Sequence, residues 1–265
     1  KTVKATTVFR ELEEKYGLTE ALIAVPAYEQ SSDQEVAFQA VDYILRVLKK
    51  NMVFGMTWGR AMHEFVEQLA KDERLRSLSF QNVKVVPFLG TPGAIQSDSW
   101  NTTTYSNTLA TKVGNLLHCA SYNLSAPMYV EGTKEKELIE SIDEIAKVLH
   151  MAETADIALI GIGSMQDDSS IIKAEIRTKE EYKELVRKGA VGEIVGRIYD
   201  KNGQTVDEDL KRKMVGISLD KIAKIPVRVG MSYGKDKIEA IKGAIAGGLV
   251  NVLVTDVPTA ELLLK

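Results

Sequence analysis

The chain has 265 residues, 45% of them hydrophobic, and a formal net charge of -3. This length suits one large α/β domain or two small ones, and the near-neutral charge gives no electrostatic basis for nucleic-acid binding by this segment. The single cysteine, Cys119, excludes a disulfide within the chain, and short apolar runs without a signal-peptide core favour a cytoplasmic protein with no membrane partner.

Predicted helices and strands alternate through the first half of the chain. A charged helix over 7–16 ends at Gly17, a buried strand over 21–25 ends at Pro26, and a turn and N-cap cluster lies at 31–33. The alternation continues with a helix over 36–48, a strand from Met52, a helix over 62–69, a strand over 83–89 and a helix over 109–117.

The second half repeats this pattern. Its predicted elements are a strand or edge segment over 126–130, a long helix over 138–149, a strand over 155–160, a charged helix over 179–188, a shorter element over 189–193, a hairpin-type turn over 199–203, a strand over 226–230, a helix over 238–245, a strand over 250–254 and a final helix after Pro258.

This alternation predicts an α/β fold with a mostly parallel sheet covered by helices on both faces. Ligands of such sheets bind beyond the carboxyl ends of the strands. The segments expected at those ends are 55–60, 90–93, 161–163, 230–237 and Asp256. Because no repeat or linker interrupts the pattern, we expect a single domain over residues 1–265.

The turn after the second predicted strand is the main candidate site. It consists of Gly55, Met56, Thr57, Trp58, Gly59 and Arg60. A strand that turns tightly into a helix aims free backbone N–H groups, the helix dipole and a threonine hydroxyl at one point. Phosphate suits that point best. The alternative is a plain strand–helix turn in which the glycines serve geometry alone.

Further candidates lie in the neighbouring loops. Lys235 and Lys237 could neutralise a phosphate or form a Schiff base, or could be solvated charges of a first helical turn. Glu193 and Asp256 could accept hydrogen bonds from sugar hydroxyls, although Asp256 equally fits an N-cap of the last helix. The remaining candidates for effector contacts are Gly90, Thr91, Asn107 and Gly163.

The polar segment 96–106 contains Trp100 and Tyr105 and is too long for a mere connector. Loops of this length are often lids or binding loops, and the alternative is an exposed surface loop.

Other familiar motifs are missing. Gly161 and Gly163 fail the dinucleotide pattern because the third position is Gln166, and no Walker loop or nucleophile elbow is present. The three histidines are widely spaced within helical patterns, which favours ordinary helix residues over metal ligands. We therefore expect no cofactor, no metal and no catalytic residues.

Four motifs in order resemble the SorC family of bacterial sugar-responsive transcriptional regulators. They are Gly-Met-Thr-Trp-Gly-Arg at 55–60, Gly-Ala-Val-Gly-Glu-Ile at 189–194, Gly234 with Lys237, Ala240 and Ile241, and Asn-Val-Leu-Val-Thr-Asp at 251–256. The likeness covers nearly the whole chain, and the shared order and spacing are more specific than any single motif. The family's N-terminal helix-turn-helix domain is absent here, so we expect an effector-domain segment.

The resemblance implies a Rossmann-like three-layer sandwich, similar to phosphosugar isomerases, that senses a ligand and is not an enzyme. It implies a phosphorylated sugar or polyol as effector, a dimer or tetramer of the chain, and operator DNA bound only through the missing domain. It also implies that Thr57, Trp58, Gly59 and Arg60 hold the phosphate, with Lys237 near it and Glu193 on the sugar hydroxyls. The chain carries Leu89 where members often have a basic residue, which suggests a ligand with one phosphate or different polar contacts from 96–106.

Two other functions compete with the sensor. A phosphosugar isomerase or deaminase on the same scaffold would need a general base, and Glu193 or Asp256 could serve. A purely structural oligomerisation module predicts instead a closed, apolar turn at residues 55–59. The single effector-binding domain could itself include a small oligomerisation subdomain.

Overall fold

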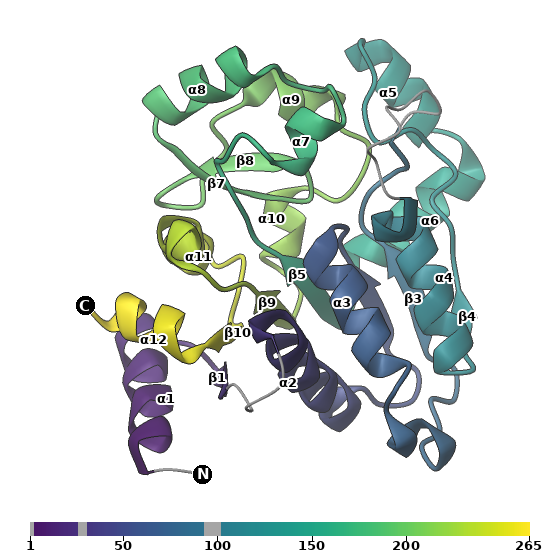
Figure 1. Ribbon diagram of the computed structural model, residues 1–265. Helices are drawn as coiled ribbons and strands as arrows, with labels where there is room; N and C mark the ends of the chain where they lie inside the picture. Colours follow the sequence, from purple (N-terminus) through teal and green to yellow (C-terminus); the bar gives the residue numbers. More distant parts are fainter. Residues whose placement is uncertain (1–2, 26–30, 93–101) are drawn as a thin grey trace.

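A seven-stranded sheet in the order β1-β10-β9-β5-β2-β3-β4 organises the computed structural model, which describes residues 3–25, 31–92 and 102–265 (Figure 1). Every pair of neighbouring strands in it is parallel. The strands are β1 (Glu20–Ala24), β2 (Val53–Met56), β3 (Lys84–Pro87), β4 (Ala120–Ser121), β5 (Ile157–Gly161), β9 (Val227–Met231) and β10 (Val252–Asp256). The predicted parallel sheet is confirmed.

Helices cover both faces of this sheet and complete a three-layer α/β fold. One face packs against α2 (Ser32–Val47), α3 (Arg60–Leu69) and α4 (Ser106–Leu116), which share one apolar core with the strands. The other face packs against α1 (Val3–Tyr16), α6 (Asp143–Glu153), α10 (Leu219–Ile222), α11 (Ile238–Ala246) and α12 (Val257–Leu264). Burial of this apolar surface is the main stabilising contribution to the fold.

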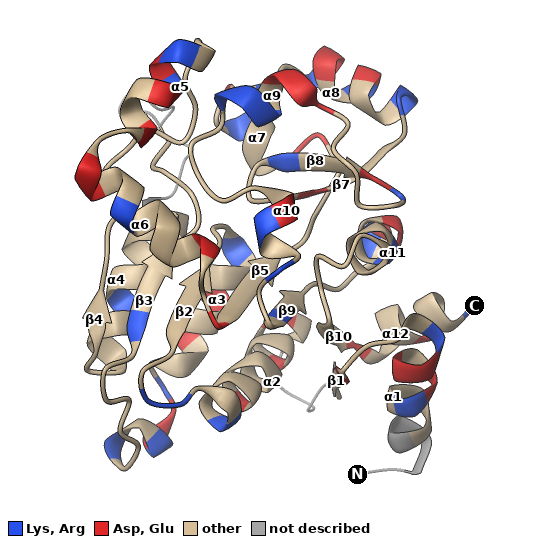
Figure 2. Ribbon diagram, turned by 180° about the vertical axis from the view of Figure 1, so that it is seen from behind, with Lys and Arg blue, Asp and Glu red and all other residues tan. Residues whose placement is uncertain are grey.

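A smaller antiparallel sheet stands at the carboxyl edge of the main one. Its strands, in the order β6-β7-β8, are β6 (Gly163–Ser164), β7 (Ala190–Ile194) and β8 (Arg197–Asp200). Because β6 begins two residues after β5 ends, the main sheet leads directly into it (Figure 1). Around it lie α7 (Ser170–Lys173), α8 (Lys179–Arg187) and α9 (Glu208–Lys213), with acidic and basic residues interspersed on α8 and α9 (Figure 2).

The sequence was misleading in three places. The single helix predicted over 138–149 is two helices, α5 (Thr133–Glu140) and α6, because Ile142 is extended and caps α6. Leu138 and Ile142 belonged to the supposed core face, yet they are 70% and 52% exposed. The segment 126–130 forms only isolated bridges, Thr91 to Pro127 and Tyr129 to Met214, while the unpredicted β4 takes the sheet edge.

Turns and short helices complete the description. The predicted reversal over 199–203 is present, with the Asp200 amide donating to the Gln204 carbonyl at 2.9 Å. The three 3₁₀ helices among the described residues are η1 (Glu73–Arg76), η2 (Thr102–Thr104) and η3 (Lys235–Lys237). Residues 96–101 of the predicted binding loop lie outside the described residues. In the part of the chain that the structure does describe, no helix combines the length and the apolar character needed to cross a bilayer.

Gly90 marks a close crossing of two chain segments. A Cβ at this position would stand 2.6 Å from the carbonyl oxygens of Ala126 and Pro127, and neither backbone atom can rotate away. We expect Gly90→Ala to lower the free energy of unfolding by about 2 kcal/mol in urea denaturation. Gly132→Ala is the control, because its Cβ would meet nothing nearer than 3.8 Å, and we expect a change below about 0.5 kcal/mol. Equal losses for both variants would contradict the crossing as the cause.

Candidate functional site

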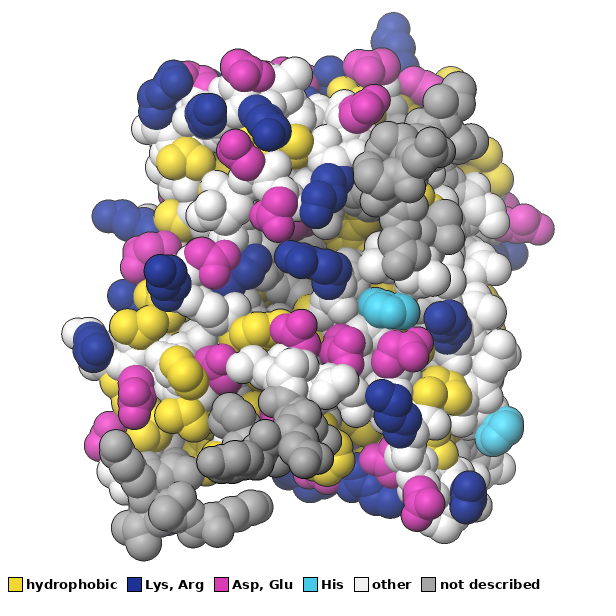
Figure 3. Space-filling model, viewed as in Figure 1, with side chains coloured by type: hydrophobic (Ala, Val, Ile, Leu, Met, Phe, Trp, Pro, Cys, Tyr) yellow, Lys and Arg dark blue, Asp and Glu magenta, His cyan; other side chains and the backbone are white. Residues whose placement is uncertain are grey.

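The candidate site lies where β2, β5 and β9 end side by side at the carboxyl edge of the main sheet. The residues that follow these strands come from 57–60, 162–168 and 232–237, and strand β7 of the small sheet faces them. On the face shown in Figure 3, the surface is hollowed between its upper and lower parts, and basic and acidic side chains border the hollow. The sheet topology therefore brings four distant stretches of sequence together.

Thr57 joins the ends of two neighbouring strands. Its side chain is 1% exposed, and its hydroxyl oxygen accepts a hydrogen bond from the Gly161 amide at 3.0 Å. Its own amide donates to the Leu159 carbonyl at 3.1 Å. A hydroxyl that accepts in this way keeps its hydrogen for a further acceptor. Thr57 can thus donate to a ligand from a fixed position.

The first turn of α3 provides backbone donors beside Thr57. Gly59 caps this helix with φ 107°, a conformation that favours glycine. The Gly59 amide donates to the Thr104 carbonyl at 3.0 Å, so this amide is already used by the protein. The amides of Arg60, Ala61 and Met62 lie in the first turn, where a helix supplies no acceptor. An anion at this end would therefore be bound through these three amides, which directly follow Gly59.

Glu193 is a buried carboxyl group on β7, 7% exposed. It accepts hydrogen bonds from the Gly196 amide and from the side chain of Trp58. Burial raises the pKa of Glu193 to about 7, and the Gly196 hydrogen bond, the charge of Lys237 and the Trp58 hydrogen bond oppose this rise. The contact with Trp58 places the carboxyl group directly beside the β2–α3 turn.

Lys237 reaches the same place from the loop after β9. Burial lowers the pKa of its ammonium group, and the negative charges of Asp236, Glu193 and Asp168 oppose this effect. Arg60, another basic group in this neighbourhood, forms an exposed ion pair with Asp168 at 3.6 Å. The structure therefore brings Thr57, Trp58, Arg60, Glu193 and Lys237 together, and their contact with an effector stays a prediction.

Asn107 and Thr91 hold neighbouring segments to each other. The Asn107 amide nitrogen donates to the Thr91 hydroxyl at 2.8 Å and to the Leu124 carbonyl at 3.0 Å, and its oxygen accepts from the Leu124 amide at 2.8 Å. Three hydrogen bonds to the protein use most of the capacity of one amide side chain. These contacts fix the start of α4 against the loop that follows β3.

One acidic and one basic candidate have simpler surroundings. Asp256 caps α12, because its carboxylate accepts from the Thr259 amide at 2.9 Å, and this confirms the N-cap interpretation. Lys235 is exposed in η3, as expected of a solvated charge.

The remaining candidates are small or apolar residues of the framework. Gly163 lies opposite Glu193 in the β6–β7 pair, and a Cβ on it would stand 2.8 Å from a Glu193 carboxylate oxygen. Gly55 lies under the Phe88 ring, and Met56 is buried at the end of β2. Leu89, the departure from the family pattern, is fully buried.

Sequence reasoning missed Asp168 and the Gly196 amide. Gly196 belongs to the two-residue turn between β7 and β8, where Val195 has φ 55° and Gly196 has φ 68°. Such turns normally carry Asn, Asp or Gly at the first position, so a valine there concealed the hairpin. Asp168 follows β6 in a loop with no motif around it. No group of three His, Cys, Asp or Glu side chains that could hold a metal ion occurs among the described residues.

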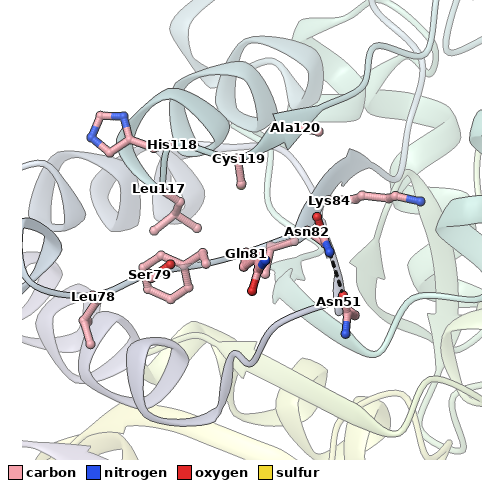
Figure 4. Close-up of a pocket in the computed structure, with 12 residues that line it drawn as sticks. Asn51, Leu78, Ser79, Gln81, Asn82, Lys84, Leu117, His118, Cys119 and Ala120 are labelled. Atoms are coloured by element: carbon pink, nitrogen blue, oxygen red, sulfur yellow. Dashed lines mark hydrogen bonds between the residues drawn. The ribbon is translucent and has the colours of Figure 1, made fainter.

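A separate groove of about 760 Å³ lies at the opposite, amino edge of the main sheet (Figure 4). Its lining comes from the segments that precede β2, β3 and β4 and includes Asn51, Phe80, Asn82, His118 and Cys119. The Asn82 amide donates to the Asn51 side-chain oxygen at 3.1 Å across its wall. None of the predicted site residues lines this groove.

Comparisons with known proteins agree with the fold and the motifs. The Sugar-bind family, described as "Putative sugar-binding domain", matches residues 3–265. The chain is 30% identical to the sorbitol operon regulator of Klebsiella pneumoniae over 260 residues. The aligned region covers 97% of this chain and 79% of that protein. It is 25% identical over 257 residues to the deoxyribonucleoside regulator of Bacillus subtilis, which covers 96% and 78%.

Solved structures show the same architecture. The full-length sorbitol operon regulator SorC from Klebsiella pneumoniae aligns with a TM-score of 0.87 and 27% identity over 100% of this chain and 82% of that one. A DeoR family transcriptional regulator from Listeria monocytogenes aligns with a TM-score of 0.84 and 24% identity, over 98% and 99% of the two chains, and supports the fold alone. Since one family profile covers the chain from residue 3 to residue 265 and a full-length relative shares both its sequence and its fold, the chain belongs to the SorC family of sugar-binding transcriptional regulators.

Proposed function

We propose that this domain binds a phosphorylated sugar or polyol at the carboxyl edge of the main sheet. The phosphate accepts hydrogen bonds from Thr57 and from the first turn of α3, and the Lys237 ammonium group neutralises part of its charge. The Glu193 carboxyl group binds the sugar hydroxyls. The observation that supports this most directly is the convergence of Trp58 with Glu193 and Lys237, which both lie more than a hundred residues further along the chain.

The chemistry of these groups favours a phosphate monoester over a neutral sugar. Lys237 is partly desolvated, so its charge interacts more strongly with a bound anion than a solvated lysine would. Glu193 is buried among hydrogen-bond donors. Its carboxyl oxygens can therefore accept hydrogen bonds from sugar hydroxyls at a fixed position. One anion-binding end and one hydroxyl-binding end match a molecule that carries a phosphate at one end of a polyol chain.

The binding serves regulation and not turnover. Two relatives are named as a sorbitol operon regulator and a deoxyribonucleoside regulator, and the chain spans about four-fifths of the length of each. We infer that residues 1–265 form one effector-binding unit, that operator DNA is bound by a part of the longer protein outside this segment, and that the effector favours one arrangement of a dimer or tetramer.

A screen of sugar phosphates against the matching unphosphorylated sugars and inorganic phosphate tests this proposal. We expect at least one sugar phosphate to raise the melting temperature by about 5 °C or more at a hundredfold excess over its Kd. Light scattering after size-exclusion chromatography should then show a changed oligomeric state. Indifference to every sugar phosphate would contradict the sensor, and turnover of a pentose or hexosamine phosphate that Glu193→Gln abolishes would favour the enzyme.

A further inference from the structure

Arg197 is a buried arginine that no sequence motif indicated. It follows the β7–β8 turn, is 3% exposed, and pairs with Ile194 across the hairpin. Burial lowers the pKa of its guanidinium group to about 10, and the charge of Glu140 opposes this effect. A charge held so far from water needs strong hydrogen-bond partners.

Those partners are backbone carbonyl groups of a single segment. The guanidinium group donates to the carbonyl of Lys211 at 2.8 Å, to that of Met214 at 3.2 Å and to that of Gly216 at 3.1 Å. Since its rigid fork fixes the relative positions of its acceptors, Arg197 holds the 211–216 segment against the hairpin that carries Glu193.

The same segment also holds the loop after β3. Gly216 bridges Leu89, the Ile217 amide donates to the Phe88 carbonyl at 2.9 Å, and the Gly90 amide donates to the Val215 carbonyl at 3.1 Å. A Cβ at Gly216 would stand 2.5 Å from the Phe88 oxygen, so these two chain segments are in close contact. Arg197 therefore connects the Glu193 hairpin to the loop that begins at Gly90.

The turn between Glu193 and Arg197 depends on side-chain contacts that hold it in place. Val195 has φ 55° although it is β-branched, a conformation that persists only where its surroundings enforce it. On one side the Glu193 carboxylate accepts from the Gly196 amide, and on the other Arg197 is tied to the 211–216 segment. Loosening either contact frees the Glu193 carboxyl group to move.

We propose that Arg197 is a positioning residue for the sugar end of the effector site, which it orients by locking the Glu193 hairpin to the 211–216 segment and the loop at Gly90. It does not touch the ligand. This inference rests on the proposed function, because it assigns Glu193 to the sugar hydroxyls and Thr57 with Lys237 to the phosphate. The phosphate end lies on the β2–α3 turn and η3, which Arg197 does not contact.

Isothermal titration of Arg197→Met and Arg197→Lys with the sugar phosphate found in the screen and with inorganic phosphate tests the inference. We expect affinity for the sugar phosphate to fall about tenfold or more, because the Glu193 carboxyl group is no longer held in its binding geometry. Affinity for inorganic phosphate should stay within about twofold, and Arg197→Lys, which keeps one charged donor, should recover part of the loss.

Arg228→Met is the matched control. Arg228 also donates to a backbone carbonyl, that of Ile225, and its Nε is buried without a partner like that of Arg197, but it lies at the amino end of the sheet. The Arg228→Met substitution should lower the free energy of unfolding and leave the affinities for the sugar phosphate and for inorganic phosphate unchanged. Equal losses for sugar phosphate and inorganic phosphate in the Arg197 variants, or retained affinity for both, would overturn the inference. If wild-type protein does not prefer the sugar phosphate to inorganic phosphate, the proposed function fails first.

Discussion

Lys237→Met should weaken binding of the effector by about tenfold to a hundredfold. Methionine keeps the length of the side chain and removes its charge, so the phosphate loses one charge-assisted hydrogen bond, worth about 1.5–3 kcal/mol. Lys237 is half-buried, and its ammonium group interacts electrostatically with Glu193 and Arg60. Because the site is partly shielded from water, solvent does not compensate for the lost charge. Isothermal titration with the sugar phosphate gives the ratio of dissociation constants.

Lys235→Met provides the control from the same short helix. Lys235 is exposed in η3, so salt and water screen its charge from the site, and we expect its loss to change affinity by less than about twofold. The melting temperature of both unliganded variants should show that each is folded. Equal weakening by the two substitutions would mean that net positive charge attracts the ligand, with no dedicated contact from Lys237.

Glu193→Gln should change how stability depends on pH. The pKa of Glu193 in the folded protein is raised from 4.5 to about 7, because burial disfavours its charged form. The protonated form therefore stabilises the fold fully below pH 4.5, and this contribution is lost as the pH rises through 7. A shift of this size corresponds to about 3 kcal/mol. Glutamine is never charged, so the variant should gain about that much relative to wild type between pH 4.5 and pH 8.

Urea denaturation at a series of pH values measures this difference. The quantity of interest is the free energy of unfolding of the variant minus that of wild type, since contributions from all other groups cancel in it. Glu137→Gln, a substitution of an exposed residue on α5, is the control. Its own difference from wild type should stay below about 0.5 kcal/mol across the same pH range. A flat curve for Glu193→Gln would show that its carboxyl group is ionised at no cost in the fold.

Much of the site was predictable because the carboxyl edge of a parallel sheet is a consequence of topology. Once strands and helices alternate, the ends of β2, β5 and β9 must share one edge, whatever their side chains. Thr57 and Lys237 therefore lie beyond the carboxyl ends of β2 and β9, as the predicted parallel sheet required, while their contact with a ligand stays a prediction. The N-cap role of Asp256 was one of two alternatives, and its contact with the Thr259 amide confirms that role.

What could not be predicted depends on contacts between segments that have no periodic signature. The helix break at Ile142 is invisible to a count of apolar positions, because that count cannot distinguish an exposed isoleucine from a buried one. The partners of Arg197 are carbonyl groups, which every residue possesses, so no residue type marks them in the sequence. The Gly59 amide likewise donates to the carbonyl of Thr104 in η2, a contact between distant segments that no motif marks.

The pairing of the first strand with the last has a consequence for synthesis of the protein. β1 has only β10 as its neighbour in the main sheet, with Glu20 aligned to Val252, and β10 is followed by a single helix. While the nascent chain is still on the ribosome, residues 20–24 therefore wait without a partner until almost the entire domain has been translated. Long-range closure of this kind is slow and leaves an unpaired edge exposed to other chains. A premature stop before residue 252 would thus release a product prone to aggregation, even with the turn between β2 and α3 intact.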